Sequence, residues 1–541
     1  MSPRGENGRG SRLRLTDDSR QLFLWSCVTV ALLALALRVY DLQSNPPELF
    51  EDELSGIVGA WQIVTTGHDI EKTWLPFIVT RLEFKQPVYF LATLIPHAIF
   101  GPQVWAMRLP AALFGVTSAL LLIWLVRRTF GRSRIEAVIA GALFAIVPWA
   151  VHYGRIAWEP AAFLPFALAG IGLLWSGLEG HDRRRILWGA AVLAIGAYTY
   201  HPALIVNLLM AIAVLAFHAR RMRAADWASL AIASAIGAIV LLPYARAVLT
   251  EPLFTERHQQ VSVFNDGITA DAIGLAARNY AEQWNPRWLF LEGDPKLRNH
   301  PGVALTFVWL APFIGLGLVR ALRRGTRVDR LVVVWLLVGA LPAGLTNDGA
   351  PHFTRGLFAM PALLLLAASG LQWCYEWFAR VHRWSPLLAP ALVIIVAVSQ
   401  ALPTYRYYFQ SYPAASAPLW YYGASEAMAM VRANVPANGA VCIEEPLPIP
   451  YYTFPQYVTY YLPSSDFRVI EGLDHPECSH GSMYILHRVD TQLPQPRRVV
   501  GLVRDLHGDP LYALSIVVDQ PAAGELPARA HRPKSSPVVT D

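Results

Sequence analysis

The stretch QLFLWSCVTVALLALALRVY, at Gln21–Tyr40, decides the fold class of this chain. A run of about 20 apolar residues is long enough to cross the hydrocarbon core of a bilayer as a helix, and similar runs recur as far as Leu402. Of the 541 residues, 54% are hydrophobic and 16% are charged, whereas soluble domains carry about 25% charged residues. The sequence therefore predicts an α-helical, polytopic membrane protein.

The polar segment 1–20 precedes this first apolar run. Its arginines are Arg4, Arg9, Arg12, Arg14 and Arg20. The segment resembles the basic start of a signal peptide, but the apolar run is long and no small-x-small cleavage site ends it. We therefore expect an uncleaved signal anchor, with residues 1–20 forming a basic cytoplasmic N-terminus.

Most of the other arginines in the apolar part of the chain gather in short loops between apolar runs. They are Arg127, Arg128, Arg132, Arg134, Arg183, Arg184, Arg185, Arg220, Arg221, Arg223, Arg320, Arg323, Arg324, Arg327 and Arg330. Lysine and arginine are enriched in the cytoplasmic loops of membrane proteins, so this pattern predicts the topology. It also accounts for the net charge of +6, and we expect no nucleic-acid partner.

Placing these loops in the cytoplasm predicts about 11 crossings, or about 11–13 if short segments are counted. The spans lie near 21–40, 108–127, 134–151, 160–178, 186–199, 202–218, 227–248, 303–322, 330–346, 354–372 and 385–402. The apolar stretch Val88–Phe100 is shorter and contains Pro96 and His97. We expect it to be re-entrant or interfacial, because a further crossing here would move the next arginine loop outside.

This threading predicts a multi-pass protein of the plasma (inner) membrane whose polar chemistry faces outward. The expected parts are a transmembrane domain at 21–403 with a first outer loop at 41–107, an outer α/β domain at 404–519, and a disordered tail at 520–541. In the outer domain the patterns predict a helix at Ser425–Asn434 and strands at Ala440–Glu444, Arg498–Arg504 and Leu511–Val518. The sequence leaves open whether Cys442 and Cys478 pair.

Three consecutive acids, Glu51-Asp52-Glu53, stand at the start of the first outer loop's expected helix, 52–66. Ionised groups near a bilayer are costly and tend to mark function. Glu53 lies about 100° around the helix from Asp52, so we expect separate roles. Asp52 is either a general base that removes a proton from an acceptor hydroxyl or an ordinary helix N-cap. Glu53 either orients polar groups or is a solvated surface acid.

The other faces of the same helix also carry expectations. Leu54, Ile57, Val58 and Trp61 form an apolar stripe that suits the membrane interface. Ser55, Gly56 and Gly59 share a face with Asp52 and leave space beside its carboxylate. Gly67 is expected to end the helix.

The order of motifs in this part of the chain resembles a known family. The acidic turn is followed by Phe84-Lys85-Gln86-Pro87-Val88-Tyr89, then by Phe100-Gly101 and Arg108-Leu109-Pro110. This order is similar to the opening of the bacterial dolichyl-phosphate-mannose-protein mannosyltransferase-like enzymes, which include relatives of the aminoarabinose transferase that modifies lipid A. The resemblance covers about residues 20–400 and implies the GT-C fold. Gln86 replaces a usual proline, and Glu159 stands where relatives often have Asp.

The resemblance implies an inverting transfer of a sugar from a polyprenyl-phosphate donor, with Asp52 as the general base. The leaving phosphate needs cations or N–H donors. Lys85 is expected to contact this phosphate, the alternative being a snorkelling interfacial lysine. Arg355 is the next phosphate candidate and His352 a weaker one.

Arg155 lies in an outer loop with Tyr153 and Glu159. It either binds the phosphate or pairs with Glu159 to hold the loop, and we expect Glu159 and Tyr153 to serve the acceptor or the loop itself.

Other partners and functions are less specified. His68, Asp69 and Glu71 lie close in sequence without a strong metal-ligand spacing, so no metal ligand is assigned, although a divalent metal is possible. Expected partners are the polyprenyl-phosphate sugar donor, membrane lipids and an unknown lipid, glycan or protein acceptor. The alternatives are a transporter or flippase, or a ligase of lipid-linked glycans. A transporter would place charged residues in mid-span within paired repeats, whereas here they collect at span ends.

Overall fold

The chain forms two compact units. The computed structural model describes residues 7–68, 78–79, 84–251, 259–347, 349–381, 385–436, 439–444, 468–471, 473–479, 483–491 and 497–517. The units are Met1–Tyr422 and Gly423–Asp541, whereas the sequence analysis placed the start of the outer domain at residue 404. The difference arises because Tyr412 and Trp420, which follow the last apolar helix, are buried inside the first unit.

The first unit is helical. It contains α1 (Asn7–Val39), α2 (Glu51–Thr66), α3 (Pro87–Phe100), α4 (Val104–Trp124), α5 (Arg134–Ile146), α6 (Pro148–Tyr153), α7 (Pro160–Glu179), α8 (Arg183–Gly196), α9 (Ala203–His218), α10 (Ala224–Thr250), α12 (Ala270–Glu282), α13 (Leu310–Arg324), α14 (Arg327–Gly344), α15 (Met360–Val381), α16 (Ser385–Gln410) and α17 (Tyr412–Ser416). A two-stranded ribbon of β1 (Ile78–Val79) and β2 (Phe84–Lys85) precedes α3.

Each predicted span overlaps a helix of this unit. Within the described residues, seven helices are long and apolar enough to cross a membrane: α1, α4, α7, α9, α10, α15 and α16, three of them counted together with an adjoining turn. The remaining predicted spans fall on α5, α8, α13 and α14, which are shorter or carry more charge. The helical multi-pass fold is confirmed, and the number of crossings stays a prediction.

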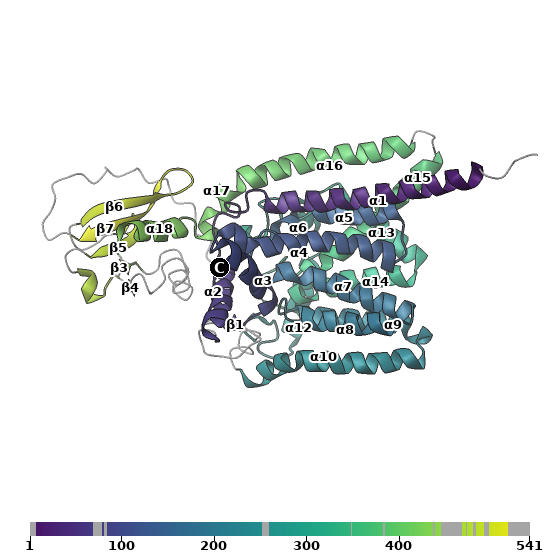
Figure 1. Cartoon of the computed structure of the whole chain (residues 1–541), viewed down its shortest axis with the longest axis horizontal. Helices are drawn as coiled ribbons and strands as arrows, with labels where there is room; N and C mark the ends of the chain where they lie inside the picture. The colour runs from purple at the N-terminus through teal and green to yellow at the C-terminus, as the bar shows by residue number, and fades with distance from the viewer. Residues whose placement is uncertain are drawn as a thin grey trace, which may run out of the picture. The chain divides into compact units, whose positions relative to one another are not determined.

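The long helices pack in two rows. Figure 1 shows α1, α4, α7, α8 and α10 lying side by side, each packed on the next. A second row runs from α5, which packs on α1 and α4, through α15 to α13. Gly317 of α13 and Gly370 of α15 face main-chain carbonyls of the opposite helix, at Leu366 and Phe313, where a Cβ would clash. Glycine therefore lets these two backbones approach closely.

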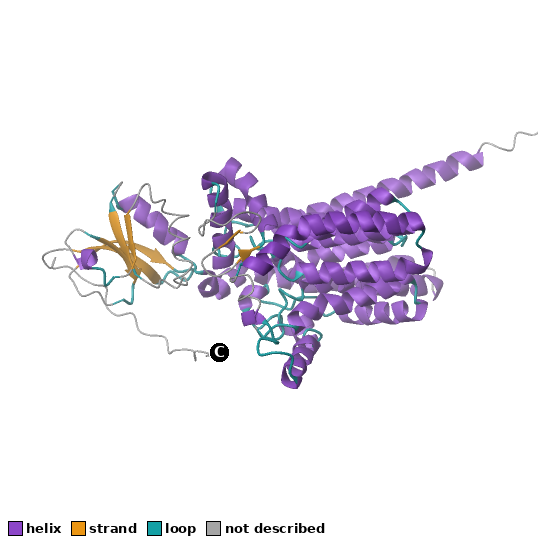
Figure 2. Ribbon diagram, turned by 90° about the horizontal axis from the view of Figure 1, so that it is seen from below, coloured by secondary structure: helices purple, strands orange, loops and turns teal. Residues whose placement is uncertain are grey.

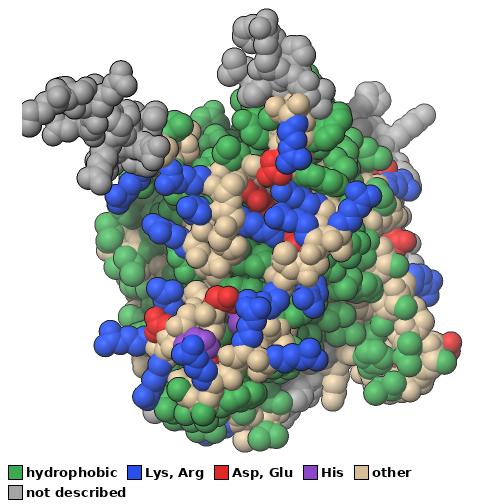
Figure 3. All heavy atoms as spheres, turned by 90° about the vertical axis from the view of Figure 1, so that its right-hand side faces the viewer, with side chains coloured by type: hydrophobic (Ala, Val, Ile, Leu, Met, Phe, Trp, Pro, Cys, Tyr) green, Lys and Arg blue, Asp and Glu red, His purple; other side chains and the backbone are tan. Residues whose placement is uncertain are grey.

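The arginine-rich loops gather at one end of the bundle. Figure 3 shows this end, where Lys and Arg side chains outnumber the acids. Two acids brace the helix ends here: Asp329 accepts from Arg132 at 2.5 Å, and Glu179 accepts from Arg327 at 2.8 Å. Helices α2 and α3 lie at the opposite end (Figure 1). The sequence-predicted separation of basic loops from the acidic turn is therefore present in the fold.

Helix α2 begins one residue before its predicted start and ends as predicted. Gly67 adopts a left-handed conformation with φ of 81° and ends the helix. The prediction for its apolar stripe was wrong, because Leu54, Ile57 and Val58 are buried inside the unit rather than turned to the membrane interface. The ring of Phe90 on α3 fills the space beside Gly56, so the small-residue face receives a helix. Only Trp61 of the stripe is exposed, at 39%.

Helix α3 is a short, apolar helix with Pro96 in its interior. At about 1.5 Å per residue it is shorter than the roughly 30 Å of a bilayer's hydrocarbon core. It packs on α2 and α4, and His97 stacks on Trp61 with ring centroids 4.2 Å apart. Its re-entrant or interfacial placement stays a prediction.

The second unit is a small α/β domain, as the sequence predicted (Figure 2). Its elements are α18 (Ala424–Asn434), β3 (Ala440–Ile443), β4 (Arg468–Glu471), β5 (Tyr484–Arg488), β6 (Arg497–Arg504) and β7 (Pro510–Val517). The strand order is β4-β3-β5-β7-β6, with β3 parallel to both neighbours and β7 antiparallel to both of its own. Helix α18 packs on β6 and β7. Cys442 and Cys478 form a disulfide, and the expected tail at 520–541 lies outside the described residues.

Candidate active site

The acidic turn at the start of α2 sends its carboxylates to different partners. Glu53 is fully buried and accepts from Arg108 Nε at 3.0 Å and Arg108 Nη2 at 3.1 Å. It also accepts the backbone N–H groups of Phe50 at 2.8 Å and Ala157 at 2.6 Å. A carboxylate with four such donors is fixed in place. Glu53 is therefore not a solvated surface acid. Its contacts fit the other alternative, in which it orients polar groups.

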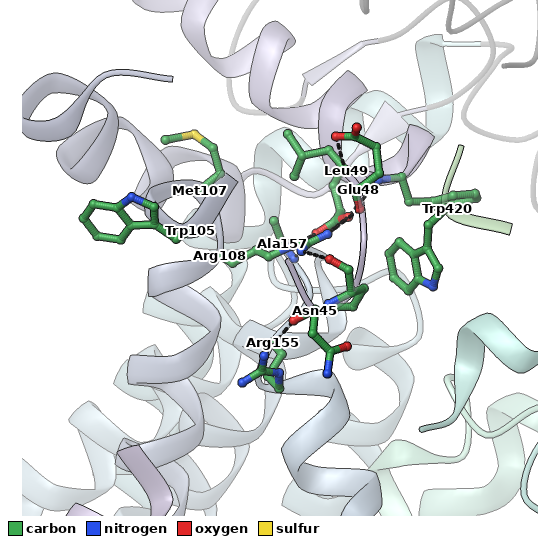
Figure 4. A network of polar contacts seen from close by, with 12 residues as sticks. Asn45, Glu48, Leu49, Trp105, Met107, Arg108, Arg155, Ala157 and Trp420 are labelled. Carbon is green, nitrogen blue, oxygen red and sulfur yellow. Dashed lines mark hydrogen bonds and ion pairs between the residues drawn. The ribbon is translucent and has the colours of Figure 1, made fainter. Parts of the chain in front are cut away.

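Arg108 completes this anchor from α4 (Figure 4). Besides Glu53, its guanidinium donates to the carbonyl oxygens of Pro46 at 2.6 Å and Glu48 at 2.5 Å. Its aliphatic and planar parts are buried, with the guanidinium carbon 5.7 Å from the Trp420 ring centroid. The Arg-Leu-Pro motif thus ties the loop before α2 and α2 itself to the bundle.

Arg155 has a structural environment. It is buried, and its two terminal nitrogens donate to four backbone carbonyls at the end of α1 and just beyond (Figure 4). These carbonyls belong to Leu37 at 3.0 Å, Arg38 at 3.1 Å, Asp41 at 3.1 Å and Asn45 at 2.7 Å. The ion pair with Glu159 is absent among the described contacts of Arg155, so that alternative was wrong. The carbonyls at the C-terminal end of a helix lack intrahelical partners and attract cations. The sequence pattern did not reveal that Arg155 reaches these carbonyls of α1.

Asp52 pairs with Lys85. The Lys85 ammonium nitrogen lies 2.5 Å from Asp52 Oδ1, and the side chains are 3% and 22% exposed, respectively. Lys85 is carried by β2, directly before α3. The N-cap of α2 is Phe50, so the alternative of Asp52 as an ordinary N-cap was wrong. The partly exposed carboxylate of Asp52 therefore pairs with a cation, and Asp52 is not the residue that caps the helix.

Glu51 forms the third branch of the turn. The Tyr421 hydroxyl donates to its Oε2 at 3.0 Å, and Phe50 stacks on Tyr421 with centroids 5.5 Å apart. Burial, and next the charge of Asp52, raises the pKa of Glu51 above its ordinary value. Aromatic residues that follow the last apolar helix thus cover one side of the acidic turn.

Arg298 is a cation of this site that the sequence analysis missed. Its guanidinium lies over the Phe50 ring, 3.5 Å from the centroid, and its charge acts on Glu51 and Tyr153. It belongs to a one-turn helix, η4 (Leu297–Asn299). A signal existed, since Lys296, Arg298 and His300 form a basic run in a predicted outer loop, where basic residues are otherwise depleted.

Arg355 and its neighbours form another wall. Tyr200, at the turn between α8 and α9, hydrogen-bonds Arg355 and feels the charges of Glu159 and Asp52. Burial raises the pKa of the Tyr200 hydroxyl. His352 is buried and its Nδ1 accepts the backbone N–H of Arg355 at 3.4 Å, so this contact shapes the turn that carries Arg355.

Glu159 and Tyr153 are both buried near this wall. Glu159 Oε1 accepts the backbone N–H of Gln86 at 2.5 Å, next to Lys85 in the chain. The Tyr153 hydroxyl lies 2.5 Å from Thr354 Oγ1, one residue before Arg355. Each residue therefore braces a segment that carries one of the cations, and any contact with an acceptor stays a prediction.

The assignment of no metal ligand stays a prediction. Within the described residues, no group of three or more His, Cys, Asp or Glu side chains could hold an ion. His68 is exposed at the end of α2, while Asp69 and Glu71 lie outside the described residues. The arrangement as a whole offers one carboxylate, Asp52, beside Lys85, with Arg298 and Arg355 on neighbouring segments. In such an arrangement the carboxylate can accept a proton from a hydroxyl, and the cations can stabilise an anionic leaving group.

Comparison with known proteins places this arrangement in a family context. Residues 85–245 match the family described as dolichyl-phosphate-mannose-protein mannosyltransferase. The protein named Putative mannosyltransferase YkcB, from Bacillus subtilis (strain 168), is 32% identical over 137 residues, which are 24% of this chain and 18% of that protein. The chain thus covers about a fifth of that relative's length.

Two solved structures share the fold. ArnT from Cupriavidus metallidurans bound to undecaprenyl phosphate matches with a TM-score of 0.54 and 14% identity, covering 92% of this chain and 98% of ArnT. ArnT in the apo state matches with a TM-score of 0.52 and 15% identity, over the same shares of both chains. The chain therefore has the GT-C fold that the ArnT structures share, and its residues 85–245 are similar to the mannosyltransferase family.

Proposed function

We propose that this protein is a membrane glycosyltransferase that moves a sugar from a polyprenyl-phosphate donor to an acceptor hydroxyl. The contact of Asp52 with Lys85 at 2.5 Å carries the proposal, because it brings a base and a phosphate-binding cation to one point. The undecaprenyl phosphate bound by ArnT supports the choice of donor lipid.

The chemistry follows from these two side chains. Asp52 takes the proton of the acceptor hydroxyl, and the oxygen attacks the anomeric carbon of the donor sugar. The bond between that carbon and the phosphate oxygen breaks on the opposite side, so the configuration inverts and polyprenyl phosphate leaves with the electron pair. Lys85 has three N–H donors and can bridge the Asp52 carboxylate and a phosphate oxygen. Its charge then offsets the charge that grows on the leaving group.

Arg298 and Arg355 are the further phosphate contacts in this proposal. Arg298 lies over Phe50, which directly precedes the acidic turn, and Arg355 is hydrogen-bonded to Tyr200, on which the charge of Asp52 also acts. Arginine can hold two phosphate oxygens at once. We infer that His352 and Tyr153 shape the Arg355 loop and that Glu159 holds the segment of Lys85. Arg155 and the Glu53–Arg108 pair then anchor the chain between α1 and α2.

The orientation in the membrane is part of the same proposal. The arginine-rich end of the bundle lies on the cytoplasmic side of a bacterial inner membrane, and the acidic turn faces the outside. The disulfide between Cys442 and Cys478 supports an oxidising compartment for the second unit. The lipid tail of the donor then lies among the helices while its phosphate reaches Lys85.

The decisive experiment is replacement of the base. Asp52→Asn keeps the side-chain shape but cannot accept the proton, so transfer of labelled sugar from a polyprenyl-phosphate donor should fall by about 100-fold or more. Asp271→Asn is the matched control, because Asp271 is an exposed acid in the first turn of α12. Transfer by Asp52→Asn at the wild-type rate, with the protein folded, would refute the proposal.

A further inference from the structure

We propose that Asp294 is a positioning residue that holds Arg298 and Arg355 as one phosphate-binding unit. The inference rests on the proposed function, since it concerns how the donor phosphate is held. Asp294 is 4% exposed and is bonded to both of the loops that carry these arginines. Nothing in the sequence pattern connects the two loops, which are separated by α13 and α14.

The first oxygen of Asp294 shapes the Arg298 loop. Oδ1 accepts the backbone N–H of Lys296 at 2.9 Å and the Asn299 side-chain amide at 3.4 Å. These two donors flank Arg298 on either side. Gly293 precedes the turn with φ of 84°, and the His300 ring occupies the space that a Cβ there would need. The turn therefore closes on Asp294, and the guanidinium of Arg298, within this turn, lies over the ring of Phe50.

Contacts from other helices fix the turn from outside. The carbonyl of Arg298 lies 2.8 Å from His152 Nε2, and the carbonyl of Leu297 accepts from the Tyr412 hydroxyl at 3.1 Å. Burial lowers the pKa of His152 to about 3, so this histidine is neutral and donates from Nε2. The backbone of Arg298 is thus held by α6 and α17, and its guanidinium lies over Phe50.

The second oxygen of Asp294 reaches the Arg355 loop. Oδ2 accepts the backbone N–H of Phe353 at 3.1 Å. Phe353 is buried with its ring edge-on to Trp149, at a centroid distance of 5.5 Å. The next residue, Thr354, is bonded to Tyr153. One carboxylate therefore sets the separation between the backbones that carry Arg298 and Arg355.

The partners of Asp294 are unusual for a buried acid. Within the described residues, each contact of its carboxylate is with a neutral N–H donor rather than with a cation. A buried carboxylate without a paired cation costs free energy, which neutral donors offset only in part. A functional role would account for keeping a buried carboxylate at this free-energy cost. In the proposal, Asp294 orders the two loops so that Arg298 and Arg355 can bind the same ligand. Asparagine in its place keeps the volume but turns an N–H group toward an N–H donor.

The test measures binding of undecaprenyl phosphate, without a sugar, to the purified full-length protein. Asp294→Asn is expected to weaken binding by about tenfold, the usual scale for losing one or two buried hydrogen bonds. In an Arg298→Gln/Arg355→Gln background the same change should add less than about twofold, because Asp294 acts through those side chains. Asp329→Asn is the matched control, since Asp329 is a buried, multiply bonded acid at the other end of the bundle.

The outcomes separate the inference from the proposed function. If wild-type protein does not bind undecaprenyl phosphate, the proposed donor is wrong. If wild type binds but Asp294→Asn binds equally well, or if Asp329→Asn weakens binding as much, the positioning role is wrong. Should Asp294→Asn fail to fold, Asn299→Ala removes one Asp294 contact beside Arg298 and is expected to weaken binding by about threefold; unchanged binding by that variant would also overturn the inference.

Discussion

Lys85 and Asp52 are in direct contact, ammonium to carboxylate, and no residue of the helix that carries Asp52 supplies this cation. Lys85 comes from the ribbon before α3, so the pair forms only when the first outer loop folds back on itself. The same loop conformation therefore places the base of the proposed reaction and its counter-ion next to each other. This relationship links the stability of the loop to the chemistry.

Replacing Lys85 with Gln should weaken binding of undecaprenyl phosphate by about tenfold or more, because a charge-assisted contact to the phosphate is lost. Turnover at saturating donor should also fall, since the leaving group loses a cation. The measurement is a lipid titration together with a transfer assay. Arg278→Gln, which removes an exposed cation on α12, is the control and should change neither value. Equal affinities for wild type and Lys85→Gln would remove Lys85 from the phosphate site.

Replacing Glu53 with Gln should lower the free energy of unfolding by about 3–5 kcal/mol, because Arg108 would remain buried without its counter-charge. Thermal unfolding of the purified protein in detergent reports this loss. Glu292→Gln breaks an exposed ion pair with Arg287 and should leave the unfolding transition close to that of wild type. Similar losses in the two variants would contradict the anchoring role of Glu53.

The pH dependence of stability should contain a contribution from His152. Burial lowers its folded pKa from 6.5 to about 3, so between these values the unfolded chain binds a proton that the folded protein excludes. Stability should therefore fall as the pH drops below 6.5, by up to about 1.4 kcal/mol per pH unit. His152→Gln should flatten the melting temperature profile between pH 6.5 and 4.5, whereas the exposed His68→Gln should leave it as in wild type. An unchanged slope in His152→Gln would show that this site does not control it.

Two glycines of α13 should respond in opposite directions to alanine. Gly317→Ala places a methyl group against the carbonyl of Leu366 on α15, so we expect a loss of about 1–3 kcal/mol from overpacking. Gly315→Ala meets open space on the same helix and should stabilise by about 0.5–1 kcal/mol, since alanine favours helices. Thermal unfolding of both variants checks this. If both changes stabilise the protein, the close crossing of α13 and α15 is wrong.

Local patterns gave much of the fold and part of the site. Hydrophobic runs located the long helices, because a helix that crosses a membrane must be apolar over a continuous stretch of about 20 residues. Gly67 and the acids located both ends of α2, and a rotation of about 100° between neighbours separated Asp52 from Glu53. In the second unit, strands with strong β patterns were found, whereas β4 and β5 were missed because they are only 4 and 5 residues long.

Contacts between residues that lie far apart in the chain could not be predicted. Arg155 seemed free to bind phosphate, since its sequence neighbours say nothing of the α1 carbonyls that it reaches. Arg298 and Asp294 gain their meaning only from Phe50 and Phe353, which lie far away in the chain. The burial of Leu54, Ile57 and Val58 likewise depends on α3 packing over Gly56. Long-range packing, not helix formation, decided each of these cases.

The Glu53–Arg108 anchor has a consequence for how this site can diverge. Among the described residues, the hydrogen bonds of both side chains run to each other or to main-chain groups: the N–H groups of Phe50 and Ala157 and the carbonyls of Pro46 and Glu48. Every amino acid supplies a main-chain carbonyl, and every one except proline supplies a main-chain N–H. The loops on either side can therefore exchange residues, and with them substrate preference, while the acidic turn keeps its shape.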